Sequence, residues 1–295
     1  MNILITGGTG FIGKELCQKL IDQNHTLSIL SRSPHQNTQA VTYYQTLANF
    51  DNLNGFDAII NLAGEPIFDK KWTTKQKDIL RASRINITQQ LVDLIKNSNH
   101  PPHTFISGSA TGFYGDLPKQ NNAKYYDELT ACGDQFAAQL CADWENTALK
   151  ANSDKTRVCL IRTGIVLNKE GGALKRMLPL YKLGLGGKIG NGSQYWSWIS
   201  LEDHVNAILF LLNNPNSKGA YNFVSPEPIT HAEFNRILSQ VVKRPAFFHA
   251  PEIMLKMILG ERSQLLLDNQ PLVPQKLLNE GFTFQDNKLT PSLFL

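Results

Sequence analysis

The chain has little cysteine, and its cysteines do not form sequence pairs. Its 295 residues include Cys17, Cys132, Cys141 and Cys159, with no C-x-x-C spacing among them. This usage argues against a disulfide framework and favours reduced thiols, as in the cytoplasm. The seven histidines also lack the i, i+4 spacing of a helical metal site, so we expect no metal.

Long apolar runs and strongly charged runs are also missing. No stretch approaches the ~18 apolar residues of a membrane span, and the N-terminus lacks the charged and then apolar regions of a secretory signal. The net charge is only +4, without a dense Lys/Arg run. We therefore expect a cytoplasmic globular protein with no nucleic-acid or membrane partner.

The first thirteen residues carry the clearest motif. An apolar run, Asn2–Ile5, leads into glycines at G-x-x-G-x-x-G spacing and then into an amphipathic helical pattern. Strand, glycine turn and helix together are typical of a dinucleotide site, where the turn approaches a diphosphate and the helix N-terminus binds its charge. The residues expected to contact the cofactor here are Gly7, Thr9, Gly10, Phe11, Ile12 and Gly13.

The rest of the first half alternates strand and helix patterns, which predicts a Rossmann-type, doubly wound parallel sheet. Residues 1–165 are the expected NADP-binding domain, to which 196–225 return. Residues 166–195 and 226–295 are the expected substrate-side region with a C-terminal helical cap, giving a small α+β domain. We expect the glycine-rich stretch Gly171–Gly192 to be a lid or substrate-facing segment rather than part of a sheet.

The end of the second predicted strand, Thr26–Leu30, indicates which cofactor binds. NAD-binding chains usually place a carboxylate there for the ribose 2′-hydroxyl, but no acidic residue lies between Asp22 and Asp51. Arg32 stands at this position, and a guanidinium suits a 2′-phosphate. Ser31 adds a hydroxyl. This pattern favours NADP over NAD, although Arg32 could also be an ordinary loop residue.

Several stretches together resemble the extended short-chain dehydrogenase/reductase superfamily. They include TGGTGFIG at Thr6–Gly13, NLAG at Asn61–Gly64 and the serine-rich turn that ends in Tyr114-Gly115-Asp116. Further stretches, among them RTGIVL from Arg162 and WISLED from Trp198, are similar to the "epimerase family protein" subgroup, which is nucleoside-diphosphate-sugar epimerase-like. The resemblance covers nearly the whole chain.

The resemblance implies a nicotinamide cofactor, a small-molecule substrate and a site at the carboxyl ends of the strands. Relatives of this kind often form homodimers through helices on a sheet face. Ser109 matches the superfamily's catalytic serine, and we expect it just beyond the fifth strand, His103–Ile106. The remaining expected cofactor contacts are Leu62, Ala63, Gly64, Arg84, Ser107 and Arg162; for the two arginines, a substrate anion or a surface salt bridge is an alternative.

The superfamily's Y-x-x-x-K pair is missing, because no tyrosine in the chain has a lysine four residues later. Either Phe136 or Ala137 stands in the tyrosine position, and Leu140 or Cys141 in the lysine position. Neither combination can exchange a proton as tyrosine and lysine do. Tyr114 is a candidate for a displaced acid/base group, or it packs within the turn.

Two functions remain open from the sequence. One is an NADP-dependent oxidoreductase or epimerase-like enzyme in which Ser109 orients the reacting oxygen. The other is a non-catalytic NADP(H)-binding protein that senses redox state or binds a partner. The sequence does not identify a substrate that would distinguish these two functions.

Overall fold

The first strand has three consecutive apolar residues, and they point alternately to the two faces of the central sheet. In the computed structural model, which describes residues 1–119 and 125–294, Ile3 and Ile5 lie on one face and Leu4 on the other. All seven strands are parallel, in the order β11-β6-β5-β4-β1-β2-β3. Their bounds are β1 (Asn2–Thr6), β2 (Thr26–Leu30), β3 (Val41–Tyr44), β4 (Ala58–Asn61), β5 (Thr104–Ala110), β6 (Arg157–Thr163) and β11 (Gly219–Phe223).

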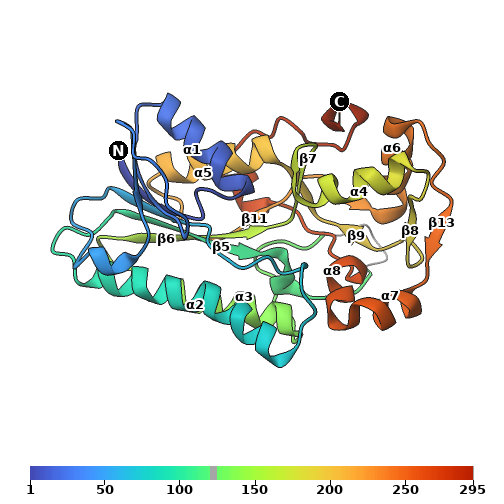
Figure 1. The fold of residues 1–295 in the computed structure, drawn as a ribbon, viewed down its shortest axis with the longest axis horizontal. Helices are drawn as coiled ribbons and strands as arrows, with labels where there is room; N and C mark the ends of the chain where they lie inside the picture. Colours follow the sequence, from blue (N-terminus) through green and yellow to red (C-terminus); the bar gives the residue numbers. More distant parts are fainter. Residues whose placement is uncertain (120–124, 295) are drawn as a thin grey trace.

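Helices cover both faces of this sheet, as the predicted doubly wound fold requires (Figure 1). α1 (Phe11–Asp22) and α5 (Leu201–Asn213) pack on the face of Ile3. α2 (Thr74–Lys96) and α3 (Phe136–Leu149) cover the face of Leu4. The order reverses between β1 and β4, which places a crevice at the carboxyl ends of these strands, where such sheets bind ligands.

A second, smaller core lies beyond the carboxyl ends of the strands. Trp196 and Trp198 are buried in it, against Phe234 and Tyr181. The two tryptophans are therefore core residues. The elements around this core are β7 (Ile165–Asn168), α4 (Gly172–Lys182), β8 (Gly187–Ile189), β9 (Tyr195–Trp196), β10 (Trp198–Ser200), β12 (Ile229–Thr230), α6 (His231–Val242), β13 (Phe248–Ala250), α7 (Glu252–Leu259) and α8 (Gln264–Leu267).

Short segments complete the chain between and after these elements. They are 3-10 turns and one short helix: η1 (Leu47–Asn49), η2 (Thr111–Tyr114), η3 (Gly260–Ser263), α9 (Gln275–Asn279) and η4 (Pro291–Phe294).

Three predicted boundaries were wrong, each because a distant segment supplies strand pairing. β5 continues past Ile106 to Ala110, since its ladder with β6 extends to Ala110 beside Thr163. The apolar run Trp196–Ile199 predicts a single strand, but the structure has two strands here that pair with different partners. The stretch Gly171–Gly192 contains β8, which pairs with β13, so it is not free of sheet.

Candidate functional site

The glycine turn between β1 and α1 has the geometry that its spacing predicts. Gly7 has a φ of +72°, and a Cβ there would lie 2.7 Å from the carbonyl of Leu62. A Cβ at Gly13 would lie 2.2 Å from the Gly7 oxygen, so α1 can pack on the turn only with glycine. At Gly10 a Cβ would meet only that same oxygen, at 3.1 Å, and the rest of its surroundings are open. The turn thus leaves space on the side where a diphosphate would approach.

The N-terminus of α1 offers unused donors beside this space. Within the described part of the chain, the backbone N–H groups of Phe11, Ile12 and Gly13 have no hydrogen-bond acceptor. Gly10 is the N-cap and supplies no side chain, and the first turn has no acidic residue. Unpaired N–H groups and the positive end of the helix dipole favour an anion here.

A second loop lies directly against the turn. Ala63 N–H donates to Thr6 Oγ1 at 3.2 Å, which holds the loop after β4 beside β1. Arg84 supports this loop from α2, because its Nη2 donates to the Glu65 carbonyl at 3.0 Å and its guanidinium stacks over Trp144. Burial lowers the pKa of Arg84. Its other donor, Nη1, bonds to the Leu80 carbonyl and Ser83 Oγ, so the guanidinium joins α2 to the residue after Gly64.

Arg32 projects into solvent at the carboxyl end of β2. Its side chain is 93% exposed, with a single ion pair in the described residues, 3.8 Å from Glu65. Lys70 lies closer to that carboxylate, at 3.0 Å. Ser31 is buried beside it and accepts the Ser33 N–H. The guanidinium therefore has the freedom to pair with a phosphate at this edge.

Ser109 lies inside β5, so the prediction that it lies just beyond this strand is wrong. Its hydroxyl donates to Glu145 Oε1 at 2.6 Å, and Arg162 closes on the same carboxylate with two hydrogen bonds of 2.8 and 2.9 Å. All three residues are buried. Arg162 and Glu145 therefore form a buried, bidentate ion pair, and the Ser109 hydroxyl proton is held by the same carboxylate.

Tyr114 belongs to the same buried group. Its hydroxyl donates to Asn222 Oδ1 at 2.6 Å and accepts from Arg162 Nη1 at 2.8 Å. Burial raises the pKa of Tyr114 well above its ordinary value, and the nearby Arg162 only partly offsets this. The hydroxyl therefore stays protonated at neutral pH, which favours the interpretation of Tyr114 as a packing residue.

The two possible alignments on α3 concern side chains that face different ways. Phe136 turns toward the start of α2, where its ring lies 5.1 Å from that of Trp72, just before the helix, and 4.9 Å from Lys77 Nζ. Ala137 and Cys141 face η2 at Gly112, next to Ser109. Burial raises the pKa of the Cys141 thiol to about 12, so it carries no charge. The alignment through Ala137 and Cys141 would therefore place a methyl group and a neutral thiol on this side of α3.

Two other expected cofactor contacts lie in the interior. Ser107 is fully buried, and its hydroxyl accepts from Asn61 at 3.4 Å. Arg162 is held by Glu145 and Tyr114. Glu145 and Asn222 are not among the site residues that the sequence predicts. For Glu145 a signal existed, because a carboxylate on an otherwise apolar helix face indicates a buried partner.

A cavity of about 340 Å³ lies where the second core meets the turn after β5. Gln270 Nε2 donates to the carbonyls of Thr111 and Gly115, which fixes the residues around α8 against η2. The lining is polar and includes Asp116, Lys119, Gln135, Lys256, Gln264 and Asp268. The buried Oε1 atoms of Gln135 and Gln264 have no hydrogen-bond donor in the described structure.

The carboxyl of Asp268 has the most useful pKa in this cavity. Burial, and then the neighbouring Asp116 carboxylate, raises its pKa from 3.8 to about 7, against smaller opposing effects of Gln135 and Lys256. A carboxyl that titrates near neutral pH can both give and take a proton, as general acid/base catalysis requires.

This pKa gives a testable pH dependence. In the unfolded chain Asp268 titrates near its ordinary pKa of 3.8, so its favourable contribution to stability is complete below about pH 4 and is lost as pH rises through 7. Asn cannot ionise. Asp268→Asn is therefore expected to be more stable than the native chain at pH 8 by about 1–2 kcal/mol, allowing for partial exposure, and equal at pH 4. Urea unfolding at both pH values measures this; the exposed Asp51→Asn is the control, and a pH-independent difference would contradict the assignment.

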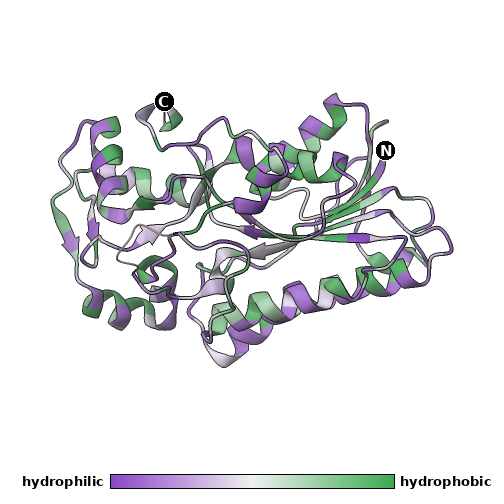
Figure 2. Ribbon diagram, turned by 180° about the vertical axis from the view of Figure 1, so that it is seen from behind, coloured by the Kyte–Doolittle hydropathy of each residue, from purple (hydrophilic) through white to green (hydrophobic). Residues whose placement is uncertain are grey.

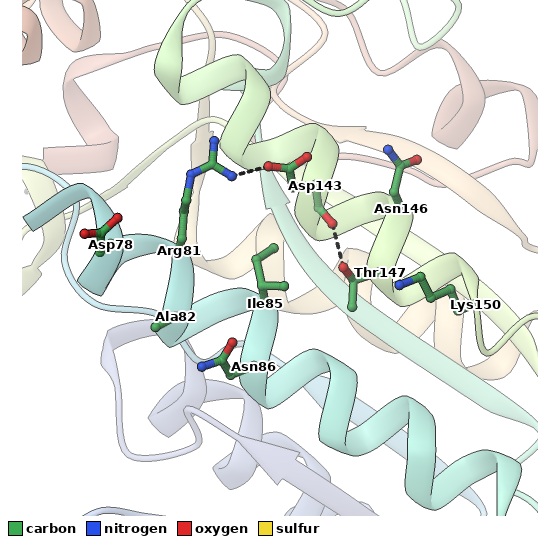
Figure 3. Close-up of a pocket in the computed structure, with 9 residues that line it drawn as sticks. All are labelled: Asp78, Arg81, Ala82, Ile85, Asn86, Asp143, Asn146, Thr147 and Lys150. Carbon is green, nitrogen blue, oxygen red and sulfur yellow. Dashed lines mark hydrogen bonds and ion pairs between the residues drawn. The ribbon is translucent and has the colours of Figure 1, made fainter. Parts of the chain in front are cut away.

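Another hollow, of about 530 Å³, lies on the outer side of α2 and α3 (Figure 3). Arg81 spans it to Asp143, and Lys150 lies at its edge. It contains neither the glycine turn nor residues of the Asp268 cavity. We therefore do not assign the cofactor or the chemistry to it.

A glycine turn against a helix N-terminus, at the switch point of a parallel sheet, defines the dinucleotide-binding class of α/β proteins. Comparison with known families agrees with this class. Residues 3–224 match the NAD dependent epimerase/dehydratase family, and the chain belongs to it. Residues 250–293 match a domain of unknown function, DUF1731.

Relatives match over nearly the full length. The epimerase family protein SDR39U1 homolog, chloroplastic, of Arabidopsis thaliana is 37% identical, with 97% of this chain and 83% of the relative covered. The crystal structure of human epimerase family protein SDR39U1 (isoform2) with NADPH is 32% identical, with a TM-score of 0.91 over 100% of this chain and 98% of that one. Thermus thermophilus UDP-glucose 4-epimerase with NAD has a TM-score of 0.75 over 100% of this chain and 99% of that one; at 16% identity it is similar in fold alone.

Proposed function

We propose that this chain binds NADPH across the carboxyl ends of β1, β2 and β4. The observation that carries the proposal is the glycine turn, which is open at Gly10 and bordered by unpaired N–H groups. Arg32, exposed at the end of β2, would pair with the 2′-phosphate. The similar human protein was crystallised with NADPH, which supports the same choice of cofactor here. When bound, NADPH supplies a hydride.

Arg32→Ala tests the choice of cofactor. It is expected to weaken NADPH binding at least tenfold, about 1.4 kcal/mol, and to leave NADH binding unchanged, because only NADPH carries the 2′-phosphate. Fluorescence titration with both nucleotides measures this. Lys150→Ala, at the outer hollow, is the control for loss of a surface cation. Equal weakening of both nucleotides would show that Arg32 does not read the 2′-phosphate.

We further propose an oxidoreductase or epimerase-like activity in which Asp268 exchanges the proton. Its pKa near 7 suits this task, and the Tyr114 hydroxyl and the Cys141 thiol do not. Residues 166–195 and 226–295 would form the substrate side, since they supply most of the cavity around Asp268. The substrate is an unidentified small molecule, and a homodimer and a cytoplasmic location remain proposals.

The second candidate is a non-catalytic NADPH-binding protein. The observation that favours it is the pair Ala137 and Cys141 beside Ser109, whose proton is held by Glu145. NADPH oxidation against a panel of carbonyl compounds separates the two candidates. Sustained turnover that Asp268→Asn abolishes, with NADPH affinity unchanged, would support the enzyme. NADPH binding with no turnover across the panel favours the non-catalytic protein.

A further inference from the structure

One end of the molecule exposes a set of large apolar side chains. Helix α7 is mostly apolar, yet none of its residues is buried, and Ile253 and Met257 are 74% and 75% exposed. Phe247, just before β13, is 91% exposed. We call the following six exposed side chains the end surface: Leu183, Phe247, Phe248, Ile253, Met257 and Ile258.

Backbone pairing brings these segments together. β13 pairs in parallel with β8, with Phe248 beside Gly187, and Phe248 N–H donates to the Gly186 carbonyl at 3.2 Å. The segment around Leu183 precedes β8, and α7 begins directly after β13. β8, β13 and α7 share one end of the ribbon in Figure 1, and Figure 2 shows the apolar colouring of α7 there.

Cations surround the end surface. Lys182, Lys188, Lys243 and Arg244 are exposed, and none has an ion pair in the part of the chain that the structure describes. Two acidic residues on α7 and η3 are paired, Glu252 with Lys256 and Glu261 with Lys77, each at 2.6 Å, and Asp116 and Asp268 also act on Lys256 from the neighbouring cavity. The region therefore combines protruding apolar tips with a net positive charge.

We propose that the end surface binds an anionic lipid bilayer from one side. The apolar tips would enter the headgroup region, and the four unpaired cations would contact lipid phosphates. A second copy of the chain fits less well, because a two-fold contact would bring the same cations together. The contact is peripheral: among residues 1–119 and 125–294, no helix has the length and apolar content to cross a bilayer.

The arrangement on the surface supports a bilayer over a protein groove. Phe247, Ile253 and Met257 are 91%, 74% and 75% exposed, so they can enter a headgroup region without a shaped partner groove. Because α7 buries none of its residues, the fold itself gives no packing reason for its apolar sequence. This proposal does not depend on the proposed enzymatic function.

Co-sedimentation with vesicles tests the proposal. The native chain is expected to bind phosphatidylcholine vesicles with 25% phosphatidylglycerol at least tenfold more than pure phosphatidylcholine, and 0.5 M salt should release it. The triple variant Phe247→Ser, Ile253→Ser and Met257→Ser should lose binding. Lys182→Gln with Arg244→Gln should weaken it severalfold on anionic vesicles.

Leu129→Ser is the matched control, because Leu129 is 92% exposed and lies in another segment. It should bind vesicles like the native chain, and the substituted side chains are exposed, so all variants should keep the native Tm. No binding to anionic vesicles, or equal binding by the triple variant, would overturn the proposal. So would a native dimer in light scattering that the triple variant converts to a monomer, since the end surface would then be a self-interface.

Discussion

Glu145→Ala is expected to lower the free energy of unfolding by about 3–5 kcal/mol. Glu145 and Arg162 are both buried, and the carboxylate accepts from Ser109 as well. Removing it leaves the guanidinium charged, buried and without its partner. The same substitution frees the Ser109 hydroxyl. Urea unfolding monitored by tryptophan fluorescence measures the loss.

Two further variants separate charge from hydrogen bonding. Glu145→Gln keeps an acceptor for Ser109 but removes the charge, so its loss should be smaller. The double variant Glu145→Gln with Arg162→Met removes both charges. It should be more stable than Arg162→Met alone or Glu145→Ala alone, because neither charge is left buried without its partner. A loss below ~1 kcal/mol for Glu145→Ala would show that water reaches Arg162 and that the pair is not a buried one.

Gly10→Ala is expected to weaken NADPH binding 10- to 100-fold, about 1.4–2.7 kcal/mol, while Tm stays near the native value. Gly10 has an extended backbone that alanine can adopt, and the added methyl group would meet only the Gly7 oxygen, at 3.1 Å. The methyl group would instead occupy space that the diphosphate needs. Fluorescence titration and thermal unfolding together measure both parts of this prediction.

Two glycines provide matched comparisons for Gly10. At Gly55 no atom lies within 4 Å of an added Cβ, so Gly55→Ala should change nothing. At Gly13 the Cβ would lie 2.2 Å from the Gly7 oxygen, so Gly13→Ala should destabilise the fold itself. If Gly10→Ala binds NADPH as the native chain does, the diphosphate does not approach this turn.

The local features of the fold were predictable from the sequence. Apolar periodicity predicts a helix at roughly Thr74–Lys96, and Ser200 and Thr230 are typical N-cap residues. All three match the structure, because periodicity and capping act over a few residues. The glycine turn was predictable for the same reason. The alternation of such local strand and helix patterns is also what predicts the parallel sheet.

The buried network could not be read from the sequence. The serine and glycine neighbours of Ser109 are typical of a turn and predict that it lies beyond β5, but pairing with β6 keeps the chain extended to Ala110. Its partner Glu145 is 36 residues away on α3, and Asn222 is 108 residues from Tyr114. Such contacts follow from how the elements pack, which one sequence does not specify.

The cavity at Asp268 depends even more on tertiary structure. Asp116 follows β5 while Asp268 follows α8, and only the packing of the second core on η2 brings their carboxyls close enough to shift a pKa. The same packing leaves α7 exposed at the end of the molecule. Neither feature has a local sequence signature.

The central claim is that the chain binds NADPH at the glycine turn. Titration of the native chain with NADPH and, separately, NADH tests it most directly, with nucleotide fluorescence as the signal. We expect saturable binding of both nucleotides, with NADPH bound at least tenfold more tightly, a difference of about 1.4 kcal/mol. Absence of binding by either nucleotide would contradict the account, and equal affinities would contradict the role of Arg32.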